Sequence, residues 1–238
     1  MALLLCSCAE RAELSLAPYD RPLRIVSVEP GLDTEVALDQ TFVLTFNDYI
    51  DPRPLTFFNT ATLTSGGVRA SIRTDYRMVD KALIVSNRRE MRSGLLYDLV
   101  LSPEVLASVT GQSFEAPEGL RFLAGSHFET RADESGEAPR WADVEPLFAP
   151  CNVCHADPEW KLVPITRAAL VGQASSQRPE LMLVRPFDPP SSYLMHKILY
   201  DYPRREGSAQ PPPWAGYEEM SRGALRLVES WIRAGALD

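Results

Sequence analysis

A series of short alternating segments between residues 21 and 131 places the tightest constraint on the fold. In residues 41–46, for example, Phe42, Leu44 and Phe46 alternate with smaller side chains, so all three lie on one face of an extended strand. Turn-forming Pro, Gly, Asp and Asn residues separate the segments. About seven such segments within about 110 residues, with no helical period, predict an antiparallel β-sandwich. The segments are residues 23–28, 41–46, 61–64, 68–73, 82–85, 97–101 and 120–123.

The second informative feature is the pattern C-x-x-C-H formed by Cys151, Cys154 and His155. This pattern is typical of the attachment site of a c-type haem. Two thiols one helical turn apart add to the vinyl groups of the porphyrin, and the histidine provides the proximal imidazole for the iron. The sequence therefore predicts one covalently bound haem c, with His155 as the proximal iron ligand.

A C-x-x-C pair also occurs in zinc sites and in thioredoxin-like redox pairs. A zinc site usually has a second pair of ligands, and His196 is the only Cys or His after residue 155. A redox pair usually follows a strand, whereas residues 141–148 form a short amphipathic run without strand character. We therefore favour the haem hypothesis over both alternatives.

The other two cysteines of the chain, Cys6 and Cys8, lie in an apolar start that a charged stretch follows at once. Residues 1–9 resemble the end of a bacterial lipoprotein signal, with Ser7 at position −1 and Cys8 as the lipid-bearing residue. The segment lacks a basic region and is shorter than the usual apolar region, as expected of a truncated signal. Lipidation of Cys6 and an ordinary apolar N-terminus are the alternatives. Processing at Cys8 would leave no partner for a structural disulfide, which favours a functional role for the C-x-x-C pair.

Charge and hydropathy exclude several classes of function. The chain has a formal net charge of −8 and no run of Lys or Arg that would form a phosphate-binding patch, so we expect no nucleic-acid partner. No stretch approaches the roughly 20 apolar residues that cross a bilayer. Association with a membrane would therefore come from the lipid anchor.

The composition changes at a polar, turn-rich segment, residues 132–140, which we interpret as a linker. The predicted organisation is a truncated signal and N-terminal tether over residues 1–20, the β-sandwich over 21–131, the linker, and a second domain over 141–238. The length of 238 residues, of which 45% are hydrophobic, is sufficient for two buried cores.

Two amphipathic segments predict helices in residues 141–238. Residues 221–235 place apolar side chains, including Leu225 and Trp231, on one helical face and charged side chains on the other. A second helix is predicted over residues 192–200. We therefore expect the second half of the chain to be mostly α-helical.

The first half of the chain is similar to bacterial Ig-like domains. The similarity rests on Phe46-Asn47-Asp48 followed by Asp51-Pro52, on Leu95-Leu96-Tyr97 and on Thr110-Gly111. It implies an Ig-like sandwich with a spacer or presentation role, and it designates no active site. Asp48, Asp51 and Asp75 are candidate calcium ligands by residue type, but we interpret them as solvated turn carboxylates.

The second half is similar to small bacterial cytochrome c-like domains of the planctomycete/myxobacterial type. Three segments carry the similarity in the order of the family, namely residues 143–155, 183–198 and 231–236. The resemblance implies a mostly α cytochrome c-like domain over residues 141–238, with the C-x-x-C-H residues in the roles given above. It also places Leu225 and Trp231 in a C-terminal helix that packs across the haem-bearing helix.

The distal iron ligand is the point at which this similarity ends. In the family a Met-Pro-Pro segment upstream of the final Trp supplies the distal sulfur, and here Gln210 stands in the position of that Met. Met220 is the first candidate replacement, followed by an open or weakly held site, and then by His196 and Met195. A His196 ligand would lower the reduction potential relative to a Met sulfur.

Together these features predict an envelope-anchored monohaem c-type cytochrome, a periplasmic or outer-membrane lipoprotein that carries electrons and is not itself an enzyme. Its partner would be a redox protein bound transiently, for which the acidic surface suits basic charge. In the alternative hypothesis the haem is structural or sensory, and the Ig-like half is the working surface for adhesion or assembly at the envelope. A six-coordinate iron favours the carrier, and a five-coordinate iron that takes up carbon monoxide favours the alternative.

Overall fold

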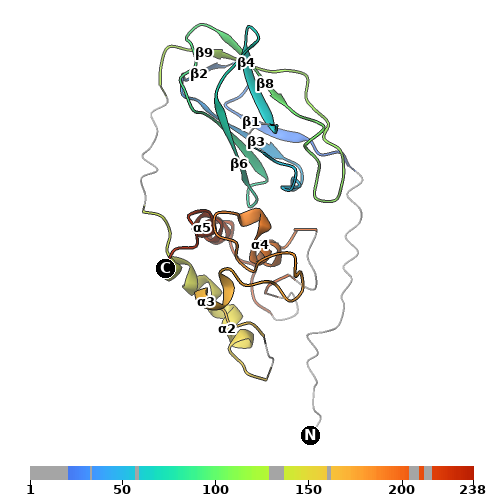
Figure 1. The fold of residues 1–238 in the computed structure, drawn as a ribbon, viewed down its shortest axis with the longest axis vertical. Helices are drawn as coiled ribbons and strands as arrows, with labels where there is room; N and C mark the ends of the chain where they lie inside the picture. The colour runs from blue at the N-terminus through green and yellow to red at the C-terminus, as the bar shows by residue number, and fades with distance from the viewer. Residues whose placement is uncertain are drawn as a thin grey trace.

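Two β-sheets pack face to face in the first half of the chain, and short helices gather at one end of this sandwich (Figure 1). The computed structural model describes residues 21–32, 34–56, 59–128, 137–159, 162–203, 209–211 and 216–238. The first sheet is antiparallel and has the order β1 (Ile25–Glu29), β3 (Thr41–Phe46), β7 (Ala82–Asn87), β6 (Ile72–Arg77). The second has the order β2 (Glu35–Val36), β9 (Leu120–Ala124), β8 (Leu96–Leu101), β4 (Ala61–Ser65), β5 (Val68–Arg69), in which β2 and β9 are parallel.

The alternating segments form the two-sheet sandwich that the sequence predicts. In β3 the side chains of Phe42, Leu44 and Phe46 are at most 2% exposed, and those between them are half-buried. The ring of Phe42 lies 4.5 Å from that of Phe122 on β9, so the two sheets meet through aromatic contacts. The predicted strand over residues 68–73 is in fact two strands, β5 and β6, which belong to different sheets.

The prediction of a mostly α cytochrome c-like domain over residues 141–238 is wrong. The molecule is mainly a β-sandwich, and its helices are short: α1 (Trp141–Val144), η1 (Glu145–Phe148), α2 (Ala149–His155), α3 (Arg167–Leu170), η2 (Pro189–Ser191), α4 (Tyr193–Ile198) and α5 (Arg222–Arg233). Twelve of the 20 prolines fall in this half. Proline lacks the N–H that continues a helix, so most helices in this half are short. In the described part of the chain, α5 is the only helix of more than two turns.

The residues that follow the sandwich share its hydrophobic core. One continuous cluster of buried side chains runs from Phe42 and Leu63 in the sheets to Phe148 and Trp231 in the C-terminal half. Trp231 is fully buried on α5, and its ring lies 5.3 Å from that of Trp141 on α1. Buried side chains of both halves therefore belong to one hydrophobic cluster.

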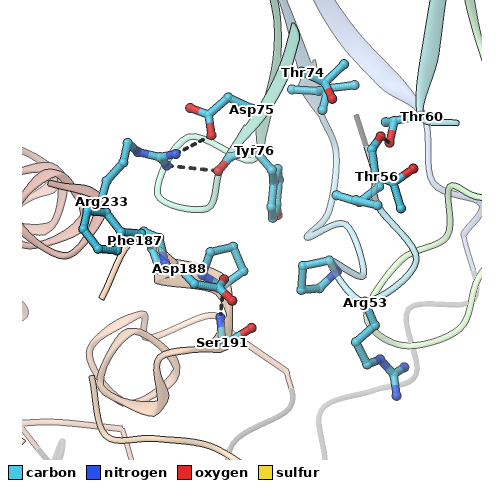
Figure 2. Close-up of a pocket in the computed structure, with 15 residues that line it drawn as sticks. Arg53, Thr56, Thr60, Thr74, Asp75, Tyr76, Phe187, Asp188, Ser191 and Arg233 are labelled. Carbon is cyan, nitrogen blue, oxygen red and sulfur yellow. Dashed lines mark hydrogen bonds and ion pairs between the residues drawn. The ribbon is translucent and has the colours of Figure 1, made fainter. Parts of the chain in front are cut away.

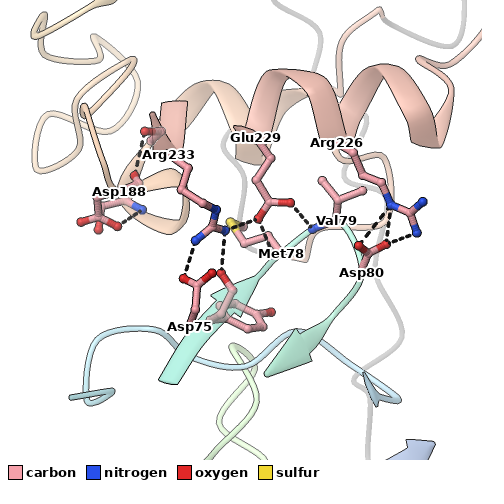
Figure 3. Close-up of polar contacts among 11 residues, drawn as sticks. Asp75, Met78, Val79, Asp80, Asp188, Arg226, Glu229 and Arg233 are labelled. Carbon is pink, nitrogen blue, oxygen red and sulfur yellow. Dashed lines mark hydrogen bonds and ion pairs between the residues drawn. The ribbon is translucent and has the colours of Figure 1, made fainter. Parts of the chain in front are cut away.

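The polar face of α5 contacts the turn between β6 and β7 (Figure 3). Glu229 is 3% exposed, and its carboxylate accepts hydrogen bonds from the backbone N–H groups of Met78, at 2.7 Å, and Val79, at 3.4 Å. Arg233, one helical turn further along, forms an ion pair with Asp75 on β6 and lies 3.2 Å from Glu229. The charged face of α5 therefore holds the C-terminal half against the sandwich. From the sequence, this charged face would be expected to lie in solvent.

A second set of polar contacts flanks this helix contact. Asp80 in the same turn pairs with both Arg222, at 3.0 Å, and Arg226, at 2.7 Å. Burial opposes the ionisation of Asp80, but the two guanidinium groups outweigh it and hold the pKa of this carboxyl below its usual range. Lys81 forms an ion pair of 2.7 Å with Asp201, which follows α4. The β6–β7 turn is therefore held from both sides by the C-terminal half.

Candidate functional site

Helix α2 carries all three residues of the C-x-x-C-H pattern. Pro150 lies in its first turn, where the absent N–H removes no helical hydrogen bond, so the chain can enter a helix directly after η1. Cys151 and Cys154 are three positions apart on this helix and therefore lie on the same side of it. His155 is the last helical residue.

Both thiols are free and half-buried. The side chain of Cys151 packs against the hydrophobic core, and burial, followed by the neighbouring Cys154, raises the pKa of its thiol. Catalytic disulfide pairs have the opposite property, because a lowered pKa supplies the reactive thiolate. The environment of Cys151 therefore does not favour the thioredoxin-like alternative.

The imidazole of His155 is held by the backbone of the loop that follows. Its Nδ1 lies 2.6 Å from the carbonyl oxygen of Val163. Because a carbonyl oxygen can only accept, Nδ1 carries the proton in this contact, so in a neutral ring Nε2 is the nitrogen that can bind a metal. Metal-binding histidines commonly have this arrangement, in which a backbone carbonyl fixes the tautomer and the orientation of the ring.

Exposed apolar side chains lie beside the motif. Val153, between the two cysteines, is 62% exposed, and Val163 is 37% exposed. A large apolar cofactor attached to the cysteines would cover apolar surface at this helix. The free thiols, the oriented histidine and the uncovered apolar side chains together fit the attachment of a haem.

The three candidate distal ligands differ in how they are engaged. Met195 is 0% exposed in the core, and His196 is 5% exposed with its Nε2 atom 2.9 Å from the carbonyl oxygen of Pro190. The His196 ring also stacks on that of Tyr202, at 4.3 Å between centroids. Met220 is half-buried and packs at the edge of the core immediately before α5.

His196 has a second distinctive property. Its Nδ1 atom is buried and has no hydrogen-bond partner among the described residues. Burial lowers the pKa of His196 to about 4, so the ring is neutral at neutral pH. Its surroundings are those of a histidine packed inside the protein, and the hydrogen bonds and ring contacts found in the described part of the chain do not connect it to His155.

The segment at Gln210 and Pro211 lies against the end of α4. The backbone N–H of Gln210 donates to the carbonyl oxygen of Lys197 at 2.8 Å, and the hydroxyl of Tyr200 donates to the carbonyl oxygen of Pro211. Pro211 is buried. The loop thus has a packing role at the end of α4 without a thioether.

The structure gives limited information on the predicted signal, the linker, and metal or membrane binding. Residues 1–20, with Cys6 and Cys8, lie outside the described residues, as does most of the predicted linker. Across the ranges that the structure describes, no group of three or more His, Cys, Asp or Glu side chains could hold a metal ion by itself. No helix among these residues has the length and apolarity to cross a membrane.

Comparisons with known proteins identify no family. No protein-family model matches the chain, and no curated protein matches it. Among solved structures, the S-layer protein SbsC is 17% identical with a TM-score of 0.34, over 44% of this chain and 14% of its own length. The L,D-transpeptidase from Mycobacterium smegmatis is 12% identical with a TM-score of 0.31, over 44% of this chain and 41% of its own.

CopC from Methylosinus trichosporium OB3b is 13% identical with a TM-score of 0.34, over 46% of this chain and 99% of its own length. This chain spans less than half of the S-layer protein and of the transpeptidase. At these TM-scores the likeness supports no inference about function, and the functional argument depends on the residues of α2.

Proposed function

We propose that this chain is an envelope-anchored monohaem c-type cytochrome. Cys151 and Cys154 hold the haem covalently, and His155 is its proximal iron ligand. When bound, the haem supplies one-electron transfer, and the residues of this chain attach and orient it. The proposal concerns a haem site on one short helix and does not require a mostly α domain.

The observation that carries the proposal is the contact between His155 Nδ1 and the Val163 carbonyl, 2.6 Å apart, directly after two free thiols. This contact commits the proton to Nδ1 and leaves Nε2 for a metal. The same loop fixes the direction of the ring, so the ligand needs little rearrangement on binding. The described residues offer no group of three or more side chains for a zinc ion, and burial raises the pKa of the Cys151 thiol, whereas a redox pair needs a lowered one.

Cys151 and Cys154 would hold the haem through two thioether bonds, which form by addition of a thiol to a vinyl group with no net oxidation or reduction. The two thiols lie on the same side of α2, as attachment to one porphyrin would require. A thiol that is half-buried beside apolar surface is suited to this addition because the porphyrin is itself apolar.

Among the distal candidates, the packing favours Met220. His196 is only 5% exposed and its Nδ1, unpartnered among the described residues, is buried, and Met195 is enclosed in the core. Met220 lies at the start of α5 and is only partly enclosed. A thioether ligand from Met220 would give the six-coordinate iron expected of an electron carrier.

The proposed location is the cell envelope, with a lipid on Cys8 as the anchor and a redox protein as the transient partner. The support for the anchor is the lipoprotein-like start of the sequence. Covalent haem attachment at C-x-x-C-H fits this location, since it belongs to proteins that are exported before they mature. A net charge of −8 suits a partner with a basic docking surface.

The test is the visible spectrum of protein matured in the periplasm, recorded oxidised and reduced. We expect the bands of a low-spin haem that remains with the chain after denaturation. Met220→Ala should convert the iron to a form that binds carbon monoxide, whereas Met195→Leu should leave the spectrum unchanged. Wild-type protein without covalent haem would refute the proposal, and a five-coordinate wild-type iron would favour the sensory alternative.

A further inference from the structure

A cleft of about 430 Å³ lies between the sandwich and the C-terminal half (Figure 2), and none of its lining residues belongs to α2. Its volume is within the range of about 300–1,000 Å³ that is usual for small-molecule sites. One wall comes from β6 and the loop before β4, and the other comes from residues 187–191 and α5. The proposed electron transfer does not use this cleft.

Thr74 supplies the most informative polar group of the cleft. It points into the sandwich from β6 and is only 8% exposed. Its hydroxyl has no hydrogen-bond partner in the described part of the chain, whereas the hydroxyl of the neighbouring Thr60 donates to the Thr56 carbonyl at 2.8 Å. Thr74 lines the cleft, and its hydroxyl oxygen is not one of the fully enclosed atoms without a partner, so it is accessible to a ligand as a donor and an acceptor.

The two guanidinium groups at the cleft are already neutralised. Arg53 Nε lies 2.8 Å from Asp51, and Arg233 is paired with both Asp75 and Glu229. Neither arginine is therefore available to a phosphate or a carboxylate. The cleft is not built for an anion.

Asp188 retains hydrogen-bonding capacity at the mouth of the cleft. One carboxylate oxygen accepts from the Ser191 N–H at 3.3 Å, and the other lies 3.6 Å from Arg185. An ionised carboxylate has about four lone-pair positions, so acceptor positions remain for hydroxyl donors. The Arg185 guanidinium, 3.6 Å away, partly compensates the charge of the Asp188 carboxylate, and this disfavours a cation as the ligand.

Phe187 provides an apolar surface at the rim. Phe187 is 72% exposed as a residue, and its backbone has φ 68°, which is costly for a residue with a side chain. The Phe187 N–H donates to the Ile232 carbonyl at 2.8 Å, and the ring lies against Gly235, where an added Cβ would be 2.6 Å from it. The glycine and the hydrogen bond hold an exposed aromatic ring in a strained position, which is a feature typical of binding sites.

We propose that this cleft binds a neutral, hydroxyl-rich ligand of sugar size, such as the end of a glycan. Ligand hydroxyls would donate to Asp188 and exchange hydrogen bonds with Thr74, and the C–H face of a sugar ring would pack on Phe187. The paired arginines argue against an anion. The lack of a three-ligand group in the residues that the structure describes argues against a metal ion.

The experiment is saturation-transfer NMR on the full-length protein with four probes: glucose, N-acetylglucosamine, maltose and chitobiose. At least one should bind, with a Kd of about 1 mM or lower. Thr74→Val keeps the side-chain shape but removes the hydroxyl, and should raise Kd about threefold to tenfold. Thr62→Val, on the outer face of the second sheet, is the matched control and should leave Kd unchanged.

Two further variants keep the test decisive if Thr74→Val does not fold. Asp188→Asn preserves the contact with Ser191 but removes the charge, and Phe187→Asn tolerates the left-handed backbone but removes the ring. Each should raise Kd about tenfold. The proposal is overturned if none of the four sugars binds, if all three variants bind as the wild type does, or if inorganic phosphate or tetramethylammonium displaces the sugar. These outcomes do not depend on whether the chain carries haem.

Discussion

The sandwich and the C-terminal half reach stability by different routes. The sandwich is built from a repeating pattern in which every second residue is apolar, and its two sheets close over aromatic and aliphatic side chains. The C-terminal half has short helices interrupted by proline, and it relies on shared core residues and on polar contacts to the β6–β7 turn. A regular pattern can therefore specify its own layer, whereas an irregular segment depends on the surface against which it packs.

The largest expected effect tests whether the two halves share one core. Phe42→Ala removes a fully buried ring from the sandwich and should lower the free energy of unfolding by about 4 kcal/mol. All four tryptophans lie after residue 140, so their fluorescence reports on the C-terminal half alone. In urea, the fluorescence transition should shift together with the far-UV circular dichroism. A fluorescence transition that stays at its wild-type position would show that the halves unfold independently.

The next effect tests the polar contact itself. Glu229→Ala leaves the Met78 N–H and the Arg233 guanidinium without their buried partner and should cost about 3 kcal/mol. Glu229→Gln keeps one carbonyl acceptor and should cost about half as much. Exposed Glu218→Ala is the control and should stay within about 0.5 kcal/mol of wild type. Equal urea midpoints for all three variants would show that the buried Glu229 contact does not stabilise the fold.

Acid should weaken the C-terminal half through His196. Its folded pKa of about 4 is below the ordinary 6.5, so the unfolded chain binds the proton first as pH falls. His196 therefore does not lower the free energy of unfolding above pH 6.5. Between pH 6.5 and about 4 it lowers this free energy progressively, by up to about 3 kcal/mol. His196→Phe should flatten this part of a plot of unfolding free energy against pH. A His196→Phe curve parallel to that of the wild type would contradict this assignment.

The smallest effect concerns the ion pairs at the edge of the β6–β7 turn. Arg222 and Arg226 are more than half exposed, so solvent screens their pairs with Asp80. Asp80→Asn should therefore cost only about 1 kcal/mol, and less in high salt. A loss as large as that of Glu229→Ala would mean that the flanking pairs, and not the buried carboxylate, hold the two halves together.

The sequence was informative where a side chain's role depends on its immediate neighbours. Alternation at Phe42, Leu44 and Phe46 was sufficient for β3, and the apolar stripe of α5 was sufficient for its buried face. The role of Glu229 was not predictable, because its partners are about 150 positions away in sequence, although the i, i+4 spacing of Glu229 and Arg233 was visible. The similarity to cytochrome c-like domains misled the fold prediction, because short matching segments do not determine helix length.

The candidate sites divide in the same way. Cys151, Cys154 and His155 could be identified from their spacing, but the Val163 carbonyl that orients His155 could not, since it belongs to an irregular loop. The cleft around Thr74 and Phe187 had no sequence signal, because it is assembled from both halves of the chain. Sites formed by a local motif can be predicted from sequence, and sites formed by packing require the structure.

The intact mass of protein matured in the periplasm tests the central claim most directly. We predict that the wild type carries the mass of one haem, retained after denaturation, and that a Cys151→Ser/Cys154→Ser double variant carries none while keeping the circular dichroism of the sandwich. An established c-type cytochrome produced in the same cells serves as the maturation control. A wild-type chain without the added mass, beside a control that has it, would contradict the account.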